Sequence, residues 1–306
     1  MTDHPDGGPR TPEQGEGSDG HLDQRPELID LPAPPTPARE LLRGTLRTPL
    51  RGRADNLPAT ALRLRRTEID RGNLLAYQQL TGFAVNDVLP PAYPHLLGFP
   101  LQAKLLGAAD FPLPLAGLVH IDNEITQLRP LYADDYPDVT VHAANLRPHP
   151  KGTAVDLITE VHLIGTLAWS SRSTYLHRGH GDNVADPGPT PPAPPTTPPS
   201  ARWRLPADLG RQYAALSGDV NPIHLHPWTA RALGFPRAIA HGMWSFARTL
   251  AAFGRDLPIQ HASRVWFRKP ILLPRTVAFV REPGSQIATV VDIKDRDRIH
   301  LLVEIS

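Results

Sequence analysis

Residues 213–243 read YAALSGDVNPIHLHPWTARALGFPRAIAHGM, and no other stretch of the chain says as much about its fold and chemistry. Its middle part, SGDVNP, is rich in turn-forming residues, so it predicts a short helix that ends in a rigid loop. Asp219 and His224 lie five positions apart with Pro222 between them, which excludes one continuous helical face. A folded loop can still direct both side chains to one place.

The residue types in this stretch are those of acid–base chemistry. A carboxylate next to an imidazole fixes its tautomer and stabilises its charged form, so Asp219 and His224 are candidate catalytic residues. The sequence AHGM at 240–243 begins a predicted helix, and the amide of Gly242 is a donor suited to a carbonyl oxygen that gains charge. Each residue alone is equally typical of a turn or a cap, and only their order favours chemistry.

Two parts of the chain resemble each other. YQQLTG at 77–82 corresponds to YAALSG at 213–218 with an offset of 136, and RPL at 129–131 corresponds to KPI at 269–271 with an offset of 140. Between these landmarks each half has a helical stretch, at 96–109 and at 243–253, and several strand-like runs follow it. The repeated order predicts a duplicated α+β unit.

Two segments without hydrophobic periodicity divide the chain. Residues 1–40 are rich in Pro, Gly, Asp and Glu, which is the composition of a disordered tail. A proline-rich run begins at Gly179, and proline removes an amide donor and fixes φ, so this run predicts an extended linker. We therefore expect a tail at 1–40, an N-terminal repeat at 41–178, a linker at 179–201 and a C-terminal repeat at 202–306.

The composition excludes several classes of protein. The chain has no cysteine, which excludes a disulfide framework, a thiolate nucleophile and cysteine-based metal sites. Its 32 Lys and Arg balance 31 Asp and Glu, which gives no case for nucleic-acid binding. The start, MTDHPDGGPR, has no apolar signal-peptide core, and no apolar run reaches the ~20 residues of a membrane span. We expect a cytoplasmic protein.

The motif at 213–243 resembles the (R)-specific enoyl-thioester hydratases, the MaoC-like or hydratase 2 group. Their signature is Y-x-x-x-S-G-D-x-N-P-I-H, followed by G-F and I-A-H-G-M. Every specified residue of it is present here, at 213–224, 234–235 and 239–243. The resemblance implies a hotdog fold, in which a long helix is wrapped by an antiparallel sheet. It extends over residues 41–306 to the double-hotdog subgroup, particularly the actinobacterial 3-hydroxyacyl-thioester dehydratases of fatty-acid synthesis. In that subgroup the second half is catalytic and the first half helps to hold the acyl chain.

The resemblance implies a lyase that interconverts trans-2-enoyl and (3R)-3-hydroxyacyl thioesters of coenzyme A or acyl carrier protein. Asp219 and His224 would hold and activate water and return a proton, and Asn221 would orient the pair or the water. The amide of Gly242 would stabilise the thioester oxygen. The duplication is compatible with a pseudo-dimeric monomer or with a homodimer.

The first half has lost this machinery, because Phe83 stands where Asp219 is in the second half and Val85 stands where Asn221 is. It can still supply an apolar wall, although core packing explains the same residues. A basic run, SRVWFRKP, can contact the phosphates or pantetheine of the carrier, although a solvated strand edge explains it equally well. The candidate substrate-binding residues are Ser217, Ile239, Phe83, Phe99, Arg268 and Lys269, with Arg264 in the same run.

We expect no metal and no cofactor, because the acid–base pair supplies the activation itself. Two ligand sets can be drawn, namely His224 with His226, and His120 with Asp122 and Glu124, but neither has a familiar metal-binding spacing. Of these, the second is better interpreted as the polar face of a strand, or as a polar contribution to the cleft. Two other functions remain as alternatives: a hotdog acyl-thioesterase, which lacks the D-x-N-P-I-H loop, and a non-catalytic acyl-thioester binding protein.

Overall fold

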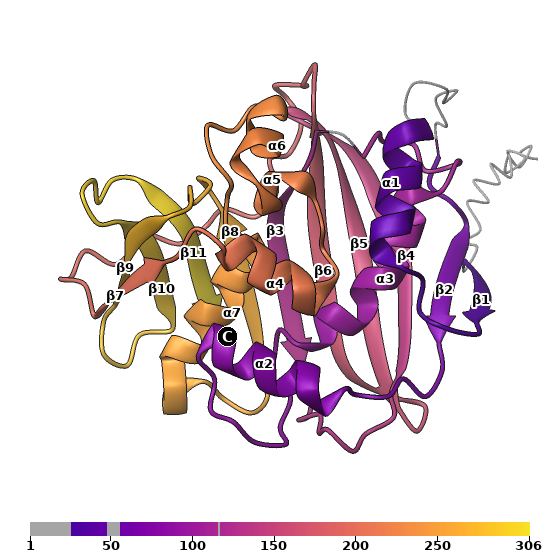
Figure 1. The fold of residues 1–306 in the computed structure, drawn as a ribbon, viewed down its shortest axis with the longest axis horizontal. Helices are drawn as coiled ribbons and strands as arrows, with labels where there is room; N and C mark the ends of the chain where they lie inside the picture. Colours follow the sequence, from indigo (N-terminus) through magenta and orange to yellow (C-terminus); the bar gives the residue numbers. More distant parts are fainter. Residues whose placement is uncertain (1–25, 48–55, 116) are drawn as a thin grey trace, which may run out of the picture.

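The computed structural model describes residues 26–47, 56–115 and 117–306. Within these residues, the strands form one continuous sheet in the order β1-β2-β4-β5-β6-β3-β8-β11-β10-β9-β7, and the helices cover one of its faces (Figure 1). Neighbouring strands are antiparallel except β1 and β2, which run parallel. A long helix against an antiparallel sheet, present twice, confirms the expected double hotdog fold.

Each half contributes one set of elements. The first half contains β1 (Glu27–Leu31), α1 (Pro37–Arg47), β2 (Thr60–Leu64), α2 (Arg71–Thr81), α3 (Pro94–Gly107), β3 (Leu118–Gln127), β4 (Asp138–His149), β5 (Gly152–Leu163) and β6 (Thr166–Arg178). The second half contains β7 (Ala201–Leu205), α4 (Leu209–Ser217), α5 (Pro222–Leu225), α6 (Pro227–Ala232), α7 (Gly242–Phe253), the 3₁₀ turn η2 (Gly254–Asp256), β8 (His261–Phe267), β9 (Arg275–Arg281), β10 (Ile287–Asp292) and β11 (Ile299–Ile305).

The two halves are joined by β3 and β8, which pair antiparallel with Glu124 opposite Arg264. These two residues are 140 positions apart, which is the offset that relates the RPL and KPI landmarks. Glu124 and Arg264 are therefore equivalent positions of the two halves, and they face each other at the centre of the β3–β8 pair. A single sheet with one central joint places the first half of the chain directly beside the second.

The helices before the two long helices end in the same way. α2 ends at Gly82 and α4 ends at Gly218, with φ of 80° and 73°, the left-handed conformation that favours glycine at a helix C-terminus. Tyr77 and Tyr213, five residues earlier, are buried, and their ring centroids lie 6.3 Å apart. The helix that leads into the SGDVNP loop therefore packs directly against its counterpart in the first half.

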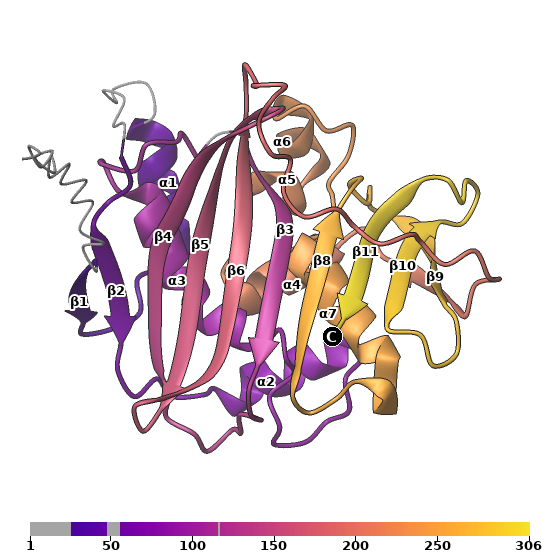
Figure 2. The same ribbon diagram turned by 180° about the vertical axis from the view of Figure 1, so that it is seen from behind.

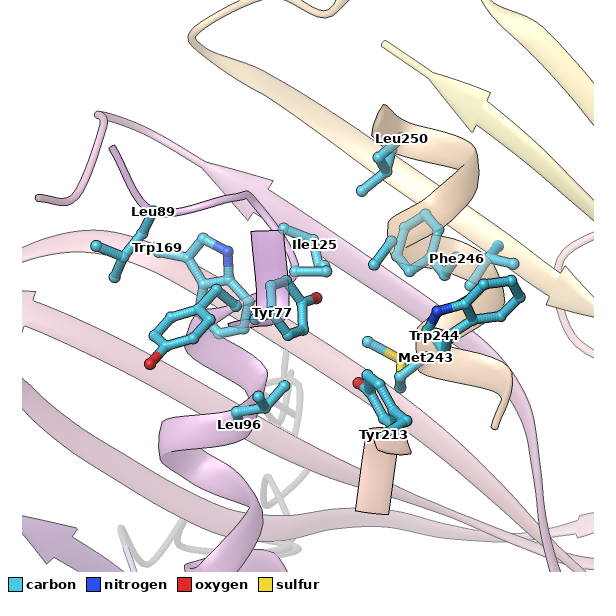
Figure 3. Packing of buried hydrophobic residues seen from close by; sticks show 14 of the residues in the cluster. Tyr77, Leu89, Leu96, Ile125, Trp169, Tyr213, Met243, Trp244, Phe246 and Leu250 are labelled. Carbon is cyan, nitrogen blue, oxygen red and sulfur yellow. The ribbon is translucent and has the colours of Figure 1, made fainter. Parts of the chain in front are cut away.

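One hydrophobic core spans both halves. Figure 3 shows Leu89, Leu96 and Ile125 of the first half in the same cluster as Phe246 and Leu250 of α7. All five are buried, with at most 7% of the side chain exposed. The halves therefore fold as one packing unit with a shared core.

The expectation of a disordered tail through residue 40 is wrong for residues 26–40. β1 pairs with β2, where Asp30 accepts hydrogen bonds from Arg63 and Arg65, and α1 crosses α3 closely enough that a Cβ on Gly107 would lie 2.6 Å from the carbonyl oxygen of Glu40. The polar composition hid these elements, because their order comes from ion pairing and from contacts with distant helices. Residues 1–25 of the expected tail lie outside the described residues.

Residues 179–200 contain no helix or strand. They cross the face of the sheet opposite the helices (Figure 2), and the indole Nε1 of Trp266 donates a hydrogen bond to the carbonyl oxygen of Pro189. The segment thus runs from β6 of the first half to β7, the outermost strand of the second half, without entering the helical face (Figure 2). Among the described helices, none is long and apolar enough to cross a membrane.

Candidate active site

The Asp219 carboxylate is held by its own loop. Ser217 Oγ donates to the carbonyl oxygen of Tyr213 at 2.9 Å and accepts the Asp219 amide at 3.2 Å. The main-chain amide of Asn221 then donates to Asp219 Oδ1 at 3.1 Å. The carboxylate is 26% exposed, so it is oriented by the loop and still reachable.

His224 lies on the short helix α5, which Asn221 caps by accepting the Ile223 amide. Its ring is buried, and Nδ1 lies 2.9 Å from the carbonyl oxygen of Ile239. A carbonyl oxygen only accepts, so Nδ1 carries the proton and Nε2 has a free lone pair. Burial lowers the pKa of His224, against the opposing effects of Asp219 and of this hydrogen bond, which keeps the ring neutral at pH 7.

His241 is a member of the site that the sequence argument missed, although it lies inside the quoted motif. Its ring stacks on His224 with centroids 3.7 Å apart and planes 24° apart. Its Nε2 donates to the carbonyl oxygen of Asp219 at 3.0 Å and lies 3.7 Å from Asp219 Oδ2. Burial, and then the neighbouring His224, hold the pKa of His241 well below its usual value. His241 thus packs against one candidate catalytic residue and holds the main chain of the other.

Asp219, His224 and His241 each present a possible ligand atom, and these atoms lie within 4.8 Å of one another. The stacking disfavours a metal ion all the same. An imidazole binds a metal such as zinc through an in-plane lone pair at about 2.0–2.1 Å, and two nearly parallel stacked planes do not converge on one ion at that distance. The arrangement is suited to holding a water molecule or a hydroxyl group between a carboxylate and a neutral imidazole.

Gly242 is the first residue of α7, so its amide has no partner within the helix. A Cβ at this position would lie 3.0 to 3.3 Å from three ring atoms of Phe267. Glycine therefore allows the helix N-terminus to approach the sheet closely, next to His241. The amide and the helix dipole together form a candidate oxyanion site.

The first half has lost the oxyanion donor as well as the carboxylate. Two isolated β-bridges stand at corresponding places in the halves: Val88 with Tyr132, and Ile239 with Leu272. When the halves are aligned on these bridges, the residue that corresponds to Gly242 is Pro91, which has no amide hydrogen. The first half cannot offer the same donor to a carbonyl oxygen.

The imidazole of His224 has no counterpart in the first half either. Six positions separate Gly82 from Val88, whereas 21 separate Gly218 from Ile239. The second half therefore carries an additional segment, which contains α5 and α6 and presents His224. Only the second half holds the complete set of groups.

The structure changes the interpretation of several predicted residues. The Ser217 hydroxyl and the Ile239 carbonyl hold Asp219 and His224 in place, as described above. Phe99 is buried and Phe83 packs on the core, while Arg268 and Lys269 are exposed immediately after Phe267.

The first metal alternative joins His224 with His226, but among the described residues the possible ligand atoms that lie together are those of Asp219, His224 and His241. His226 Nδ1 instead accepts the Trp228 amide and caps α6.

The expected polar face of His120, Asp122 and Glu124 is wrong, because β3 contains a bulge. His120 pairs with Tyr175 of β6, whereas Asp122 pairs with the adjacent Thr174. Adjacent residues of a strand point to opposite faces, so His120 lies on the helical face and Asp122 on the other. The second metal alternative fails for the same reason.

Arg264 is not available for a carrier phosphate. Its guanidinium binds both carboxylate oxygens of Asp122 at 2.8 Å and Glu124 at 3.3 Å, and Arg172 also pairs with Glu124. These ion pairs cross the joint between β3 and β8. Arg264 therefore belongs to the contact between the two halves.

Comparisons with known proteins identify the family and the fold to which the chain is similar. A family model described as a MaoC like domain matches residues 187–295. The chain is 38% identical over 253 residues to 3-hydroxyacyl-thioester dehydratase X of Mycobacterium tuberculosis, covering 82% of this chain and 90% of that protein. A crystal structure of HtdX of Mycobacterium tuberculosis superposes with a TM-score of 0.70 at 34% identity, over 80% of this chain and 98% of that one. A MaoC-like dehydratase of Phytophthora capsici shares the fold, with a TM-score of 0.67 at 20% identity, over 83% of this chain and 97% of that one.

Proposed function

The chain belongs to the MaoC-like family of 3-hydroxyacyl-thioester dehydratases, and from this premise we propose that Asp219 and His224 are its catalytic pair. The enzyme is a hydro-lyase of fatty-acid metabolism that interconverts 3-hydroxyacyl and 2-enoyl thioesters. One observation carries the assignment of the pair: a neutral imidazole with its Nδ1–H fixed by the Ile239 carbonyl lies within 4.8 Å of an oriented carboxylate.

The arrangement supports a hydration step in which one proton is moved twice. His224 Nε2 accepts a proton from water while the hydroxide oxygen bonds to C3 of the enoyl thioester. The electron pair of the C2–C3 double bond moves toward the thioester carbonyl, and the same proton is then delivered to C2. Asp219 holds the water and stabilises the transient imidazolium, since its carboxylate opposes the loss of charge on His224. Dehydration is the reverse.

The thioester oxygen gains negative charge in this step, and the amide of Gly242 is placed to donate to it. A single donor of this kind contributes about 3–4 kcal/mol in acyl-transfer enzymes, where a carbonyl oxygen also gains charge. Asn221 acts through Asp219, because the main-chain amide of Asn221 fixes one oxygen of the Asp219 carboxylate. His241 acts in the same way through the Asp219 carbonyl.

The division of labour follows from the two halves. The second half, 202–306, carries the chemistry, and the first half, 41–178, supplies the wall for the acyl chain, including Phe83 and Phe99. Residues 179–201 connect them. Arg268 and Lys269 are exposed where β8 leaves the site, which supports contacts with the phosphates of coenzyme A or of acyl carrier protein. Because both halves lie in one chain, a single copy contains a complete site. The product of hydration is the (3R)-3-hydroxyacyl thioester.

The test is a spectroscopic assay with a trans-2-enoyl-coenzyme A, followed by chiral analysis of the product. We expect loss of the enoyl absorbance, formation of (3R)-3-hydroxyacyl-coenzyme A and no release of thiol. Thiol release at a rate equal to acyl consumption would instead identify a thioesterase. Binding without any change in absorbance would identify a non-catalytic acyl-thioester binding protein.

A further inference from the structure

The first half presents a wall of rings to the catalytic groups. His95, the second residue of α3, is buried, and its ring lies parallel to that of His120 at 6.4 Å. His120 stacks on Tyr175 at 4.6 Å and contacts Phe267 at 5.1 Å. Phe267 is the side chain that packs on Gly242. The wall therefore runs from the candidate oxyanion site of the second half to the long helix of the first.

The wall shares its surroundings with Asp219. The Asp219 carboxylate interacts electrostatically with His95 and Tyr175 of the first half, as it does with Tyr213 of its own half. Burial nevertheless lowers the pKa of His95 to about 4 and that of His120 to about 3, so both rings are neutral at pH 7. The first half thus places one neutral imidazole, that of His95, near the Asp219 carboxylate.

These imidazoles have unused hydrogen-bonding capacity. His95 Nδ1 and His120 Nε2 are buried, and neither has a hydrogen-bond partner within the part of the chain that the structure describes. Buried polar atoms without partners are rare, because water is lost and nothing replaces it. His120 is enclosed by aromatic rings, whereas His95 lies at the start of α3 and is near enough to Asp219 to interact with its carboxylate. His95 is therefore the better placed of the two to meet a substrate group.

We infer that His95 contacts the substrate and forms a hydrogen bond to the oxygen at C3, the hydroxyl or water on which Asp219 acts. This inference rests on the proposed function, since that oxygen exists only in the hydration and dehydration reaction. A neutral imidazole can accept from a hydroxyl or donate to it without introducing a charge. The first half then selects for the C3 oxygen in addition to holding the acyl chain.

The test compares two ligands that differ only at C3, namely (3R)-3-hydroxyacyl-coenzyme A as substrate and the saturated acyl-coenzyme A of equal length as competitive inhibitor. His95→Phe keeps a buried ring and removes both nitrogens. We expect kcat/KM to fall by about 10- to 100-fold, the effect of losing one hydrogen bond to a buried partner, while the inhibition constant of the saturated analogue stays unchanged. His95→Asn, which restores a polar group near the position of Nδ1, should recover part of the loss.

His261→Phe is the matched control. His261 is also buried and also has a nitrogen without a partner, but it begins β8, about 20 Å along the strand from Phe267. It should leave both ligands unaffected. If His95→Phe weakens both ligands equally, or neither, then the inference is wrong while the proposed function stands. A wild-type enzyme that hydrates no enoyl thioester would overturn the proposed function, and this inference with it.

Discussion

Gly242→Ala tests the candidate oxyanion site through a contact that the structure defines. The new methyl carbon would lie 3.0 Å from Phe267 Cε1 and 3.1 Å from Cζ, whereas carbon atoms normally approach to about 3.5–4.0 Å. The start of α7 or the ring must therefore move by about half an ångström, which misdirects the amide. Removal of one oxyanion donor costs about 10²–10³ in kcat, and for a displaced donor we expect a loss of about 10- to 100-fold. Overpacking should cost ~1–3 kcal/mol of stability.

Steady-state hydration of an enoyl-coenzyme A measures this effect, with thermal unfolding as the control for folding. Phe267→Leu removes the ring atoms that collide with the methyl group, so the double variant should be faster than Gly242→Ala alone. This gain separates displacement of the amide from any general effect of the methyl group on the loop. The reasoning would be refuted if Gly242→Ala kept the wild-type kcat, or if Phe267→Leu gave no recovery in the double variant.

Three further predictions concern deletion of N-terminal residues, stability at acid pH, and removal of metal ions. Deleting residues 1–25 should preserve stability and rate, whereas deleting 1–47 removes β1 and α1 and should cost at least about 3 kcal/mol, measured by urea unfolding. In the unfolded chain the His95 imidazole binds a proton below about pH 6.5, whereas in the folded protein burial keeps it neutral down to about pH 4. The unfolded state therefore binds more protons between these two values, and the free energy of unfolding should fall as the pH drops through this window. We expect a loss of ~3 kcal/mol from His95 alone at pH 4, measured by urea unfolding. Exhaustive chelation should leave the hydration rate unchanged, and a loss restored by zinc would contradict the acid–base mechanism.

The sequence was sufficient to predict the loop that brings the candidate catalytic residues together, because a motif with fixed spacing places its residues by local geometry. Asp219 and His224 come together as expected, and the helices expected at 96–109 and 243–253 agree closely with α3 and α7. Their order along the chain also predicted the duplication. Local spacing and repeated order were enough for these features.

Features that depend on contacts between distant residues were not predictable in this way. The bulge in β3 moves His120 to the helical face, and no local pattern in LVHIDNEITQ signals it. The role of His241 follows from stacking on a residue 17 positions away. Hydrophobic alternation alone does not predict β6, because its polar side chains, such as Ser171 and Ser173, are paired with Asn123 inside the sheet.

The central claim is that one carboxylate and one imidazole of the second half act together on one water molecule. The most direct measurement is kcat for Asp219→Asn, His224→Gln and the double variant, each with thioester binding and thermal unfolding measured in parallel. General acid–base groups contribute about 10²–10⁴, so each single variant should lose at least this much while it still binds the saturated analogue. Because the residues work as a unit, the double variant should be little worse than either single one. Folded single variants that retain near-wild-type rates, or losses that multiply in the double variant, would contradict the account.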